Sequence, residues 1–176
     1  MKDKGCICLV TVDGIDFEIY KPGPFHTWWY SHKSNGPGLQ YEIGICIQTG
    51  WIFWRNGPFA CGDWADLSIA RYAITEQLGP GEKYLADGGY RSQDGNAETP
   101  TCLNNPDQKM KQDLRARHEA INGMIKRFEA LNRTFRHRRD SHQAIFNVVL
   151  NLVQANIMCE GPPFQKPYDD GRRRRR

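Results

Sequence analysis

The segment ICLVTVDGIDFEI, residues 7–19, decides how this chain folds. Apolar residues recur on both sides of the pair Asp13-Gly14, which is typical of a partly buried β-strand. Glycine permits the backbone to turn away after the aspartate, so the pattern favours an Asp13 carboxylate at the end of a strand. The segment therefore predicts strand structure on both sides of an accessible carboxylate.

Two more strands and a helix are expected next. Residues 41–47 alternate between apolar and polar, and the aromatic run at 51–54 opens a third strand that ends at Asn56-Gly57-Pro58. Three antiparallel strands in sequence order is the simplest arrangement. Asp63 is a suitable N-cap for a helix that ends at Gly79-Pro80-Gly81.

The second half of the chain predicts one strand and two long helices. Residues 83–86 form a short strand that ends at Asp87-Gly88-Gly89. Asn105-Pro106 is expected to start a helix running to about residue 130, and a last helix is expected at about 141–158. The order βββ-α-β-α-α predicts an α/β fold with a mixed β-sheet and helices on both faces. That order matches the opening of an RNase H-like sheet.

Asp13 and Asp87 share one local pattern, in which an apolar strand is followed by Asp and then Gly. Carboxylates that meet at one place repel each other unless a cation lies between them. Their hard oxygen atoms favour Mg²⁺ or Mn²⁺ over zinc. Asp-Gly is also a common turn, so the spacing alone leaves an ordinary turn open at each position.

Five segments of the chain, in this order, resemble the DDE superfamily endonucleases of Harbinger-type transposons. They are VDGIDF (12–17), WYSHKSNGPGLQYEIGICIQTG (29–50), GPFACGDWAD (57–66), LADGGY (85–90) and RARHEAINGMIKRF (115–128). The resemblance extends from about Cys8 to Asp170. It implies that residues 1–160 are the RNase H-like nuclease core of a cut-and-paste DNA transposase, without the family's usual N-terminal DNA-binding region.

The acidic triad of that family falls on Asp13, Asp87 and Glu119. The resemblance implies that these residues are catalytic and hold two divalent metal ions, Mg²⁺ or Mn²⁺. The implied reaction is two-metal phosphodiester hydrolysis, in which the ions activate a water and stabilise the leaving oxygen. With a DNA 3′-hydroxyl as the nucleophile, the same site would join strands.

Two of the acidic positions also have simpler interpretations. Glu119 lies among Arg115, Arg117 and His118, so an ordinary helix ion pair is the alternative for its carboxylate. Asp66 aligns with an acidic position of the family. Helix capping is the first interpretation of Asp66, and support of the metal ligands from an outer position is the second.

Charge is distributed unevenly along the chain, although the formal net charge is only +4. Acidic residues predominate before residue 109, and basic residues predominate in 109–142 and in the terminal run 172–176. An acidic site beside a basic track suits a polyanion, whereas a solvated helix face is the plainer alternative. The expected DNA contacts are Arg115, Arg117, Lys126, Arg127, Arg133 and Arg136. The pair His32-Lys33 follows three aromatic residues in a loop that is suited to positioning substrate.

The remaining features bear on location and partners. The six cysteines show no CxxC pair, which favours buried free thiols over zinc or disulfides. No apolar run is long enough to cross a membrane, and no secretory signal is recognisable, so an intracellular, nuclear protein is expected. The Pro- and Arg-rich residues 161–176 are expected to form a disordered tail. DNA is the expected partner, with a separate DNA-binding protein and a second copy of the chain as further candidates.

Two other functions remain open from the sequence. A domesticated, catalytically silent descendant would retain DNA binding or protein interaction without chemistry. A hydrolase of RNA–DNA hybrids would use the same carboxylates as the DNA nuclease.

Overall fold

The long strand β1 (Ile7–Glu18) forms the centre of a mixed sheet. The computed structural model describes residues 7–91, 95–99 and 106–164. The other elements are, in chain order, η1 (Thr27–Trp29), β2 (Tyr30–Ser31), β3 (Gly36–Cys46), β4 (Ile52–Ala60), α1 (Asp66–Tyr72), η2 (Thr75–Gln77), β5 (Glu82–Leu85), η3 (Gly88–Tyr90), β6 (Ala97–Glu98), α2 (Pro106–Lys126), α3 (Glu129–Asn132) and α4 (Arg139–Glu160).

Pairing of the strands places β1 between an antiparallel and a parallel half of the sheet. β3 pairs antiparallel with β1 on one side and with β4 on the other. β5 pairs parallel with β1, and β6 pairs parallel with β5. The order across the sheet is therefore β4-β3-β1-β5-β6, with the short β2 beside the first residues of β3. The three antiparallel strands expected from the sequence are confirmed, while β2 and β6 were not expected.

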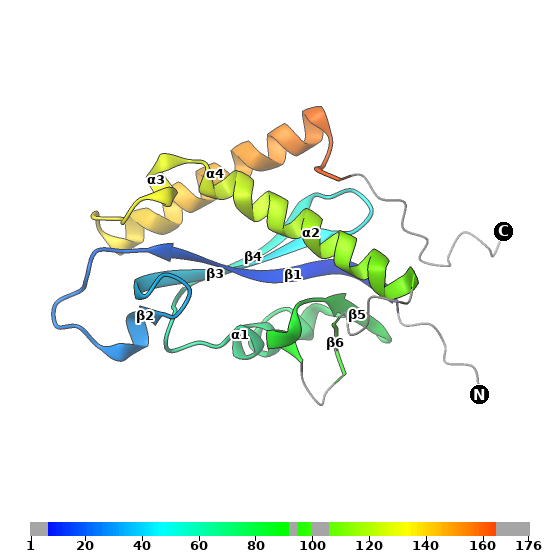
Figure 1. Cartoon of the computed structure of the whole chain (residues 1–176), viewed down its shortest axis with the longest axis horizontal. Coiled ribbons are helices and arrows are strands. Elements are labelled where there is room, and N and C mark those ends of the chain that lie inside the picture. The colour runs from blue at the N-terminus through cyan, green and yellow to red at the C-terminus, as the bar shows by residue number, and fades with distance from the viewer. Residues whose placement is uncertain (1–6, 92–94, 100–105, 165–176) are drawn as a thin grey trace.

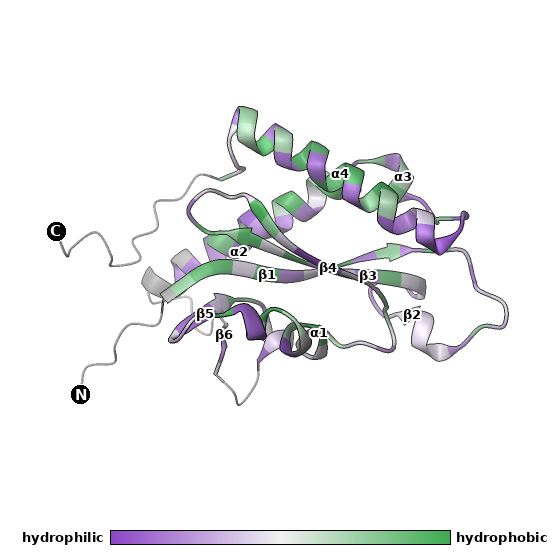
Figure 2. Ribbon diagram, turned by 180° about the vertical axis from the view of Figure 1, so that it is seen from behind, coloured by the Kyte–Doolittle hydropathy of each residue, from purple (hydrophilic) through white to green (hydrophobic). Residues whose placement is uncertain are grey.

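Helices cover both faces of this sheet, as the sequence predicted. Figure 1 shows α2, α3 and α4 on one face and α1 on the other. Figure 2 shows these layers from behind, with hydrophobic residues recurring along α4 and the strands. Within the ranges that the structure describes, none of the helices has the length and apolar character required to span a bilayer.

The larger core lies between the sheet and the three helices α2, α3 and α4. Phe17 and Tyr41 from adjacent strands meet Phe146 of α4, with the Tyr41 and Phe146 rings stacked at 3.8 Å between centroids. Ile121 and Ile125 of α2 are fully buried in the same cluster. Burial of each such side chain contributes about 1.5–3 kcal/mol to folding, so this packing fixes α2 against β1. A smaller hydrophobic cluster around Val12, Ala70 and Tyr90 packs α1 against the other face of the sheet.

Several expected boundaries were wrong. Asp63 does not cap α1, because the N-cap residue is Ala65 and Asp63 lies in a turn closed by its N–H to the Ala60 carbonyl. α2 ends at Lys126 rather than about 130, since Phe128 adopts an extended conformation before α3. The expected cap at Asn105 lies outside the described residues.

The beginning of the expected disordered tail is folded onto the protein. Gly161 donates its N–H to the Ile157 carbonyl, Pro162 packs against Gly50, and the Phe164 carbonyl accepts a hydrogen bond from Arg117. Residues 165–176 lie outside the described residues.

The cysteines that the structure describes, Cys8, Cys46, Cys61 and Cys159, are free thiols, as expected. Only Cys8 among them is buried as expected, whereas Cys46 and Cys61 are partly buried and Cys159 is exposed. Cys6 and Cys102 lie outside the described residues.

Candidate active site

Asp13 lies in the middle of β1, not at the end of a strand. It pairs with Ile43 of β3, and the strand continues to Glu18. The expectation of a strand end was wrong because β3 extends along β1 past the Asp-Gly pair and holds it in the ladder. β5, however, pairs with β1 only as far as Thr11. On that side of β1, Asp13 therefore lies just beyond the end of the neighbouring strand.

Two hydrogen bonds hold the Asp13 carboxylate. The N–H of Gly14 donates to Oδ1 at 2.9 Å, and Nδ2 of Asn122 on α2 donates to Oδ2 at 3.2 Å. Alternate residues of a strand share one face, so Asp13 points to the same side as Ile15 and Phe17, which pack against α2. Asn122 could not be singled out from the sequence, because a lone asparagine in a helix has no characteristic spacing.

Asp87 follows the end of β5 and caps the short helix η3. Its Oδ1 accepts a hydrogen bond from the Gly89 N–H at 2.8 Å. In the parallel register, Thr11 lies opposite Leu85, and continuing that register by two residues sets Asp13 beside Asp87. The two aspartates that the sequence singled out therefore flank the same point at the edge of the sheet.

Asp66, the first residue of α1, lies between β1 and η3. A Cβ atom on Gly14 would be 2.6 Å from Oδ1 of Asp66, and one on Gly89 would be 3.7 Å from Oδ2. The Gln40 amide donates a hydrogen bond to Oδ1. The absence of a side chain at Gly14 lets the Asp66 carboxylate approach the backbone of β1, and Gly89 lies within ordinary contact distance of the same carboxylate. Asp66 thus lies with Asp13 and Asp87, and we call these three residues the carboxylate cluster.

Two carboxyls of the carboxylate cluster, Asp13 and Asp66, have raised pKa values. Burial raises the pKa of Asp13 to about 6; the positive charge of Lys33 opposes this rise, and the charges of Asp87 and Asp66 add to it. Burial also raises the pKa of Asp66, which Lys33 again opposes and Asp16 and Asp87 reinforce. Burial and repulsion by neighbouring carboxylates both disfavour the charged forms of Asp13 and Asp66, so a bound cation would stabilise those charges.

Glu42 is a buried acid next to the cluster that the sequence did not reveal. Its Oε2 accepts a hydrogen bond from the Trp54 indole at 3.1 Å, while Oε1 has no partner among the described residues. Burial raises its pKa to about 7, with a smaller contribution from the charge of Asp66. Polar residues that alternate with apolar ones along a strand commonly face solvent, but α1 lies on that side of the sheet, and Gln40 and Glu42 are buried.

Lys33 is the cation that acts on this cluster. Its Nζ lies 3.5 Å from Oδ1 of Asp16, whose Oδ2 accepts a hydrogen bond from the Ser31 hydroxyl at 2.7 Å. The Lys33 side chain is 57% exposed, so the ammonium group remains accessible to solvent. The sequence-based expectation that this loop faces a substrate fits an accessible ammonium beside the carboxylates.

Glu119 lies outside the carboxylate cluster. Its side chain is 65% exposed, and its Oε1 is 3.7 Å from the Arg115 guanidinium one turn earlier on α2. This is the ordinary helix ion pair that the sequence left open as the alternative. Glu119 is nevertheless three residues before Asn122, and residues three apart are neighbours on a helix surface. The helix face that carries Glu119 is therefore adjacent to the face that contacts Asp13.

Arg117 occupies an interior position, which conflicts with the expected contact to DNA phosphate. Only 2% of the residue is exposed. Its Nη1 donates to the Ile47 carbonyl at 2.6 Å, and its Nε donates to the Phe164 carbonyl at 3.1 Å. The next residue, His118, is also buried; its Nδ1 is 2.8 Å from the Thr11 hydroxyl, and burial lowers its pKa to about 3. Both side chains join α2 to the sheet.

The other expected DNA contacts are accessible. Arg115 is half-buried beside Glu119, and the rest are exposed on the end of α2 and the segments after it. These exposed residues are Lys126, Arg127, Arg133 and Arg136.

The donor atoms suit a hard cation, although the described residues contain no ready-made metal centre. Within residues 7–91, 95–99 and 106–164, no group of three or more His, Cys, Asp or Glu side chains is close enough to hold a metal ion. Oδ1 of Asn122 is buried without a hydrogen-bond partner in the described part of the chain, and it belongs to the amide that contacts Asp13. Carboxylate and amide oxygens are ligands that Mg²⁺ and Mn²⁺ accept. The site therefore fits such ions in its chemistry.

The chain matches a known protein-family model. The family model described as DDE superfamily endonuclease matches residues 12–154, which includes every residue of the carboxylate cluster and Glu119. No curated protein and no solved structure matches the chain. Endonucleases of this superfamily act on DNA and generally use divalent metal ions. Because the match covers most of its length, the chain belongs to the DDE superfamily endonucleases.

Proposed function

We propose that this chain is the RNase H-like nuclease core of a Harbinger-type transposase that hydrolyses phosphodiester bonds in DNA with two Mg²⁺ or Mn²⁺ ions. The observation that carries the proposal is that Asp13, Asp66 and Asp87 lie near one another where the parallel strand β5 ends, so that the charges of Asp66 and Asp87 both raise the pKa of Asp13. The sheet order β4-β3-β1-β5-β6, antiparallel on one side of β1 and parallel on the other, supports the RNase H-like assignment.

The proposed metal ligands are Asp13, Asp87 and Glu119, with Asp66 beside them. When bound, the divalent ions would supply a water of lowered pKa and offset the charge that develops on the phosphate. The protein's own contribution is to hold the oxygen ligands in place. Asn122 orients Asp13, the Gly89 N–H orients Asp87, and Gln40 orients Asp66. Partners that orient ligands in this way typically contribute 10- to 100-fold to metal affinity or activity.

Glu119 would join the site by exchanging Arg115 for a metal ion. The present ion pair is exposed and therefore weak, worth at most about 1 kcal/mol. A change of side-chain rotamer is a small cost compared with the attraction between a carboxylate and a divalent cation. The adjacency of Glu119 to the Asn122 face of α2 supports this exchange.

DNA would approach from the side that carries the accessible cations. Lys33 stands at the carboxylate cluster, and Arg115, Lys126, Arg127, Arg133 and Arg136 are proposed to contact phosphates. Neutralising phosphates with such side chains makes binding fall with increasing salt. Arg117 is excluded from this set because its guanidinium is already bound to two backbone carbonyls.

Nicking of supercoiled plasmid DNA tests the nuclease directly. We expect the chain to nick the plasmid in Mg²⁺ or Mn²⁺ and to leave it intact in EDTA. An Asp87→Asn preparation, purified in parallel, identifies any contaminating nuclease. A folded wild-type protein that binds DNA and yet nicks in neither metal would contradict the proposal and favour the catalytically silent alternative. Parallel reactions on an RNA–DNA hybrid distinguish the DNA nuclease from a hybrid-specific hydrolase.

A matched pair of glutamates tests whether Glu119 is a ligand. Glu119 and Glu129 are both exposed and both paired with an arginine one turn away, at 3.7 and 3.1 Å. We expect Glu119→Gln to weaken Mn²⁺ binding by about 10- to 100-fold, because a direct ligand should matter at least as much as the partners that orient ligands. Glu129→Gln should leave Mn²⁺ binding unchanged. The measurement is the Mn²⁺ concentration dependence of the melting temperature, which reports binding without requiring catalysis. If the two variants bind Mn²⁺ equally well, Glu119 is not a ligand and only forms a surface ion pair with Arg115.

A further inference from the structure

A short extended segment between α3 and α4 is fastened to the end of β1. The Phe135 N–H donates to the Glu18 carbonyl at 2.9 Å, and the Tyr20 N–H donates to the Phe135 carbonyl at 2.7 Å. Phe135 is 5% exposed and packs its ring edge-on against His142, with 4.7 Å between centroids. Because neighbouring residues of an extended chain point in opposite directions, fixing Phe135 inward directs Arg136 outward.

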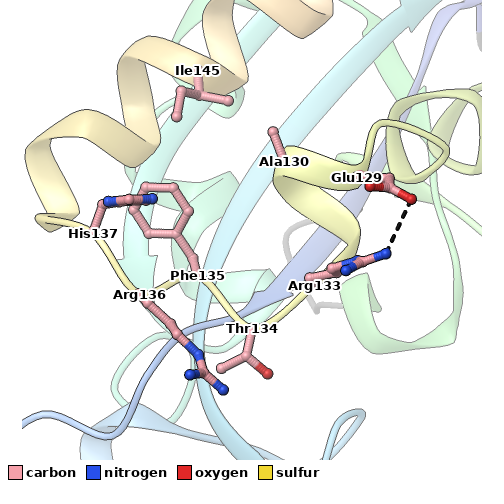
Figure 3. Close-up of a pocket in the computed structure, with 8 residues that line it drawn as sticks. All are labelled: Glu129, Ala130, Arg133, Thr134, Phe135, Arg136, His137 and Ile145. Carbon is pink, nitrogen blue, oxygen red and sulfur yellow. Dashed lines mark hydrogen bonds and ion pairs between the residues drawn. The ribbon is translucent and has the colours of Figure 1, made fainter.

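Arg136 faces an open hollow on the outer side of this segment. The hollow measures about 430 Å³, and we call it the basic hollow. Its lining includes Tyr20, Lys21, Gly23, Arg136, Arg138 and Arg139. A second hollow of about 470 Å³ shares Phe135, Arg136 and His137 with the first and is more apolar, with Ala130 and Ile145 in its wall. Figure 3 shows this second hollow, with the Arg136 side chain directed away from Ala130 and Ile145.

The cations around the basic hollow differ in how far they are neutralised. Arg138 pairs with Asp140 at 3.2 Å, and the Arg139 guanidinium lies over the Trp29 ring at 4.5 Å. Arg133, on the far side, pairs with Glu129 (Figure 3). Arg136 forms no ion pair or hydrogen bond with the part of the chain that the structure describes. Its guanidinium is therefore available for an anion, in a fork geometry that matches phosphate oxygens.

The basic hollow lies along β1 from the carboxylate cluster. On one edge of β1, β5 pairs as far as Thr11, and the next backbone pairing is the bridge between Ile19 and Phe135. Ile19 comes six positions after Asp13 in extended chain, which corresponds to about 20 Å at roughly 3.3 Å per residue. Duplex DNA rises about 3.4 Å per base pair, so a duplex that lies along β1 spans about six base pairs over this distance.

We propose that the basic hollow binds the sugar-phosphate backbone of the DNA substrate about six base pairs from the phosphodiester bond at the carboxylate cluster, with Arg136 as the main contact and Arg139 as the second. This placement rests on the proposed nuclease function. The site reads no bases: it holds the duplex on the β1 side of the cluster and so determines which bond reaches the carboxylates.

The salt dependence of DNA binding tests the hollow without requiring cleavage. The probe is a fluorescent duplex of about 20 base pairs, titrated in EDTA between about 50 and 200 mM salt. Each phosphate contact contributes about 0.9 to the slope of log K against log salt. We expect Arg136→Gln to reduce the slope by about 1, and the double variant with Arg139→Gln to reduce it by about 2. Arg55→Gln, an exposed arginine on β4 away from the hollow, should leave it unchanged. An unchanged slope in the double variant would overturn the site.

Neutral methylphosphonates, placed one at a time along the strand from the cleaved bond, test the distance. Cleavage by the wild type should weaken when the neutral group lies about five to seven phosphates away, and the double variant should be insensitive there. Wild-type cleavage that is indifferent to all of these positions would overturn the placement. If no cleavage occurs at all, the nuclease proposal fails, while the salt slopes still report on the hollow.

Discussion

Asp13→Asn is expected to abolish metal-dependent cleavage while making the metal-free protein more stable. Cleavage should fall by on the order of 10²–10³, the size of effect seen when one preorganised electrostatic group is removed from an active site. Stability should rise because the change removes a charge that the folded protein disfavours. A residue that weakens the fold and supports function is the expected signature of a site built for a cation.

The sign of the stability effect follows from the pKa of Asp13. The folded pKa of about 6 lies above the ordinary aspartate pKa of 3.8, so the folded state binds the proton more tightly than the unfolded chain does. Below about pH 4 the Asp13 carboxyl therefore does not lower the free energy of unfolding. The loss grows as the pH rises from about 4 to about 6 and stays constant at higher pH. Two units of pKa correspond to on the order of 3 kcal/mol.

Urea unfolding in EDTA at pH 4 and at pH 7.5 measures this cost. The variant should be more stable than the wild type by about 2–3 kcal/mol at pH 7.5 and equal to it at pH 4. The new amide keeps an acceptor for the Gly14 N–H, and its NH₂ group can donate to the unpaired Oδ1 of Asn122 after that amide rotates. A stability difference that does not change with pH would show that Asp13 is not a strained buried acid.

The features of this site that could be predicted from the sequence are those that depend on the local pattern of residues. Apolar runs ending in Asp-Gly located Asp13 and Asp87, and the parallel pairing of β1 and β5 brought them together. The exact place of Asp13 within β1 was not predictable, because it depends on how far β3 extends along the strand. Local sequence does not report the length of a partner strand.

The residues that were missed are those whose role depends on tertiary contacts. The alternating sequence of β3 is compatible with a surface position for Glu42, but in the folded protein α1 covers that face of the strand. Asn122 was missed, and Arg117 was expected to contact DNA. The two residues lie five positions apart on α2, and only the packing of α2 on β1 turns one toward Asp13 and the other into the interior. Charge in a sequence shows which residues are basic, but burial decides which of them can meet a phosphate.

Arg117→Ala is expected to lower the free energy of unfolding by about 3 kcal/mol without removing a DNA contact. The change deletes two charged hydrogen bonds, each typically worth about 1.5–3 kcal/mol, and leaves the buried Ile47 carbonyl unpaired. One effect opposes this loss. Burial lowers the pKa of Arg117, which means that the interior disfavours its charge, and the alanine variant no longer buries that charge. Alanine leaves a void where the long side chain was, so the destabilising terms should dominate.

Arg127→Ala is the matched control, since Arg127 follows the end of the same helix and is exposed. It should change stability by no more than about 0.5 kcal/mol. Its effect should appear in DNA binding instead, as a slope of log K against log salt that is smaller by about 1, whereas Arg117→Ala should retain the wild-type slope. Urea unfolding and salt titration of both variants therefore separate an arginine that supports the fold from one that meets phosphate. The opposite outcome, a stable Arg117→Ala with a reduced slope, would return Arg117 to the DNA-binding surface and require α2 to expose it.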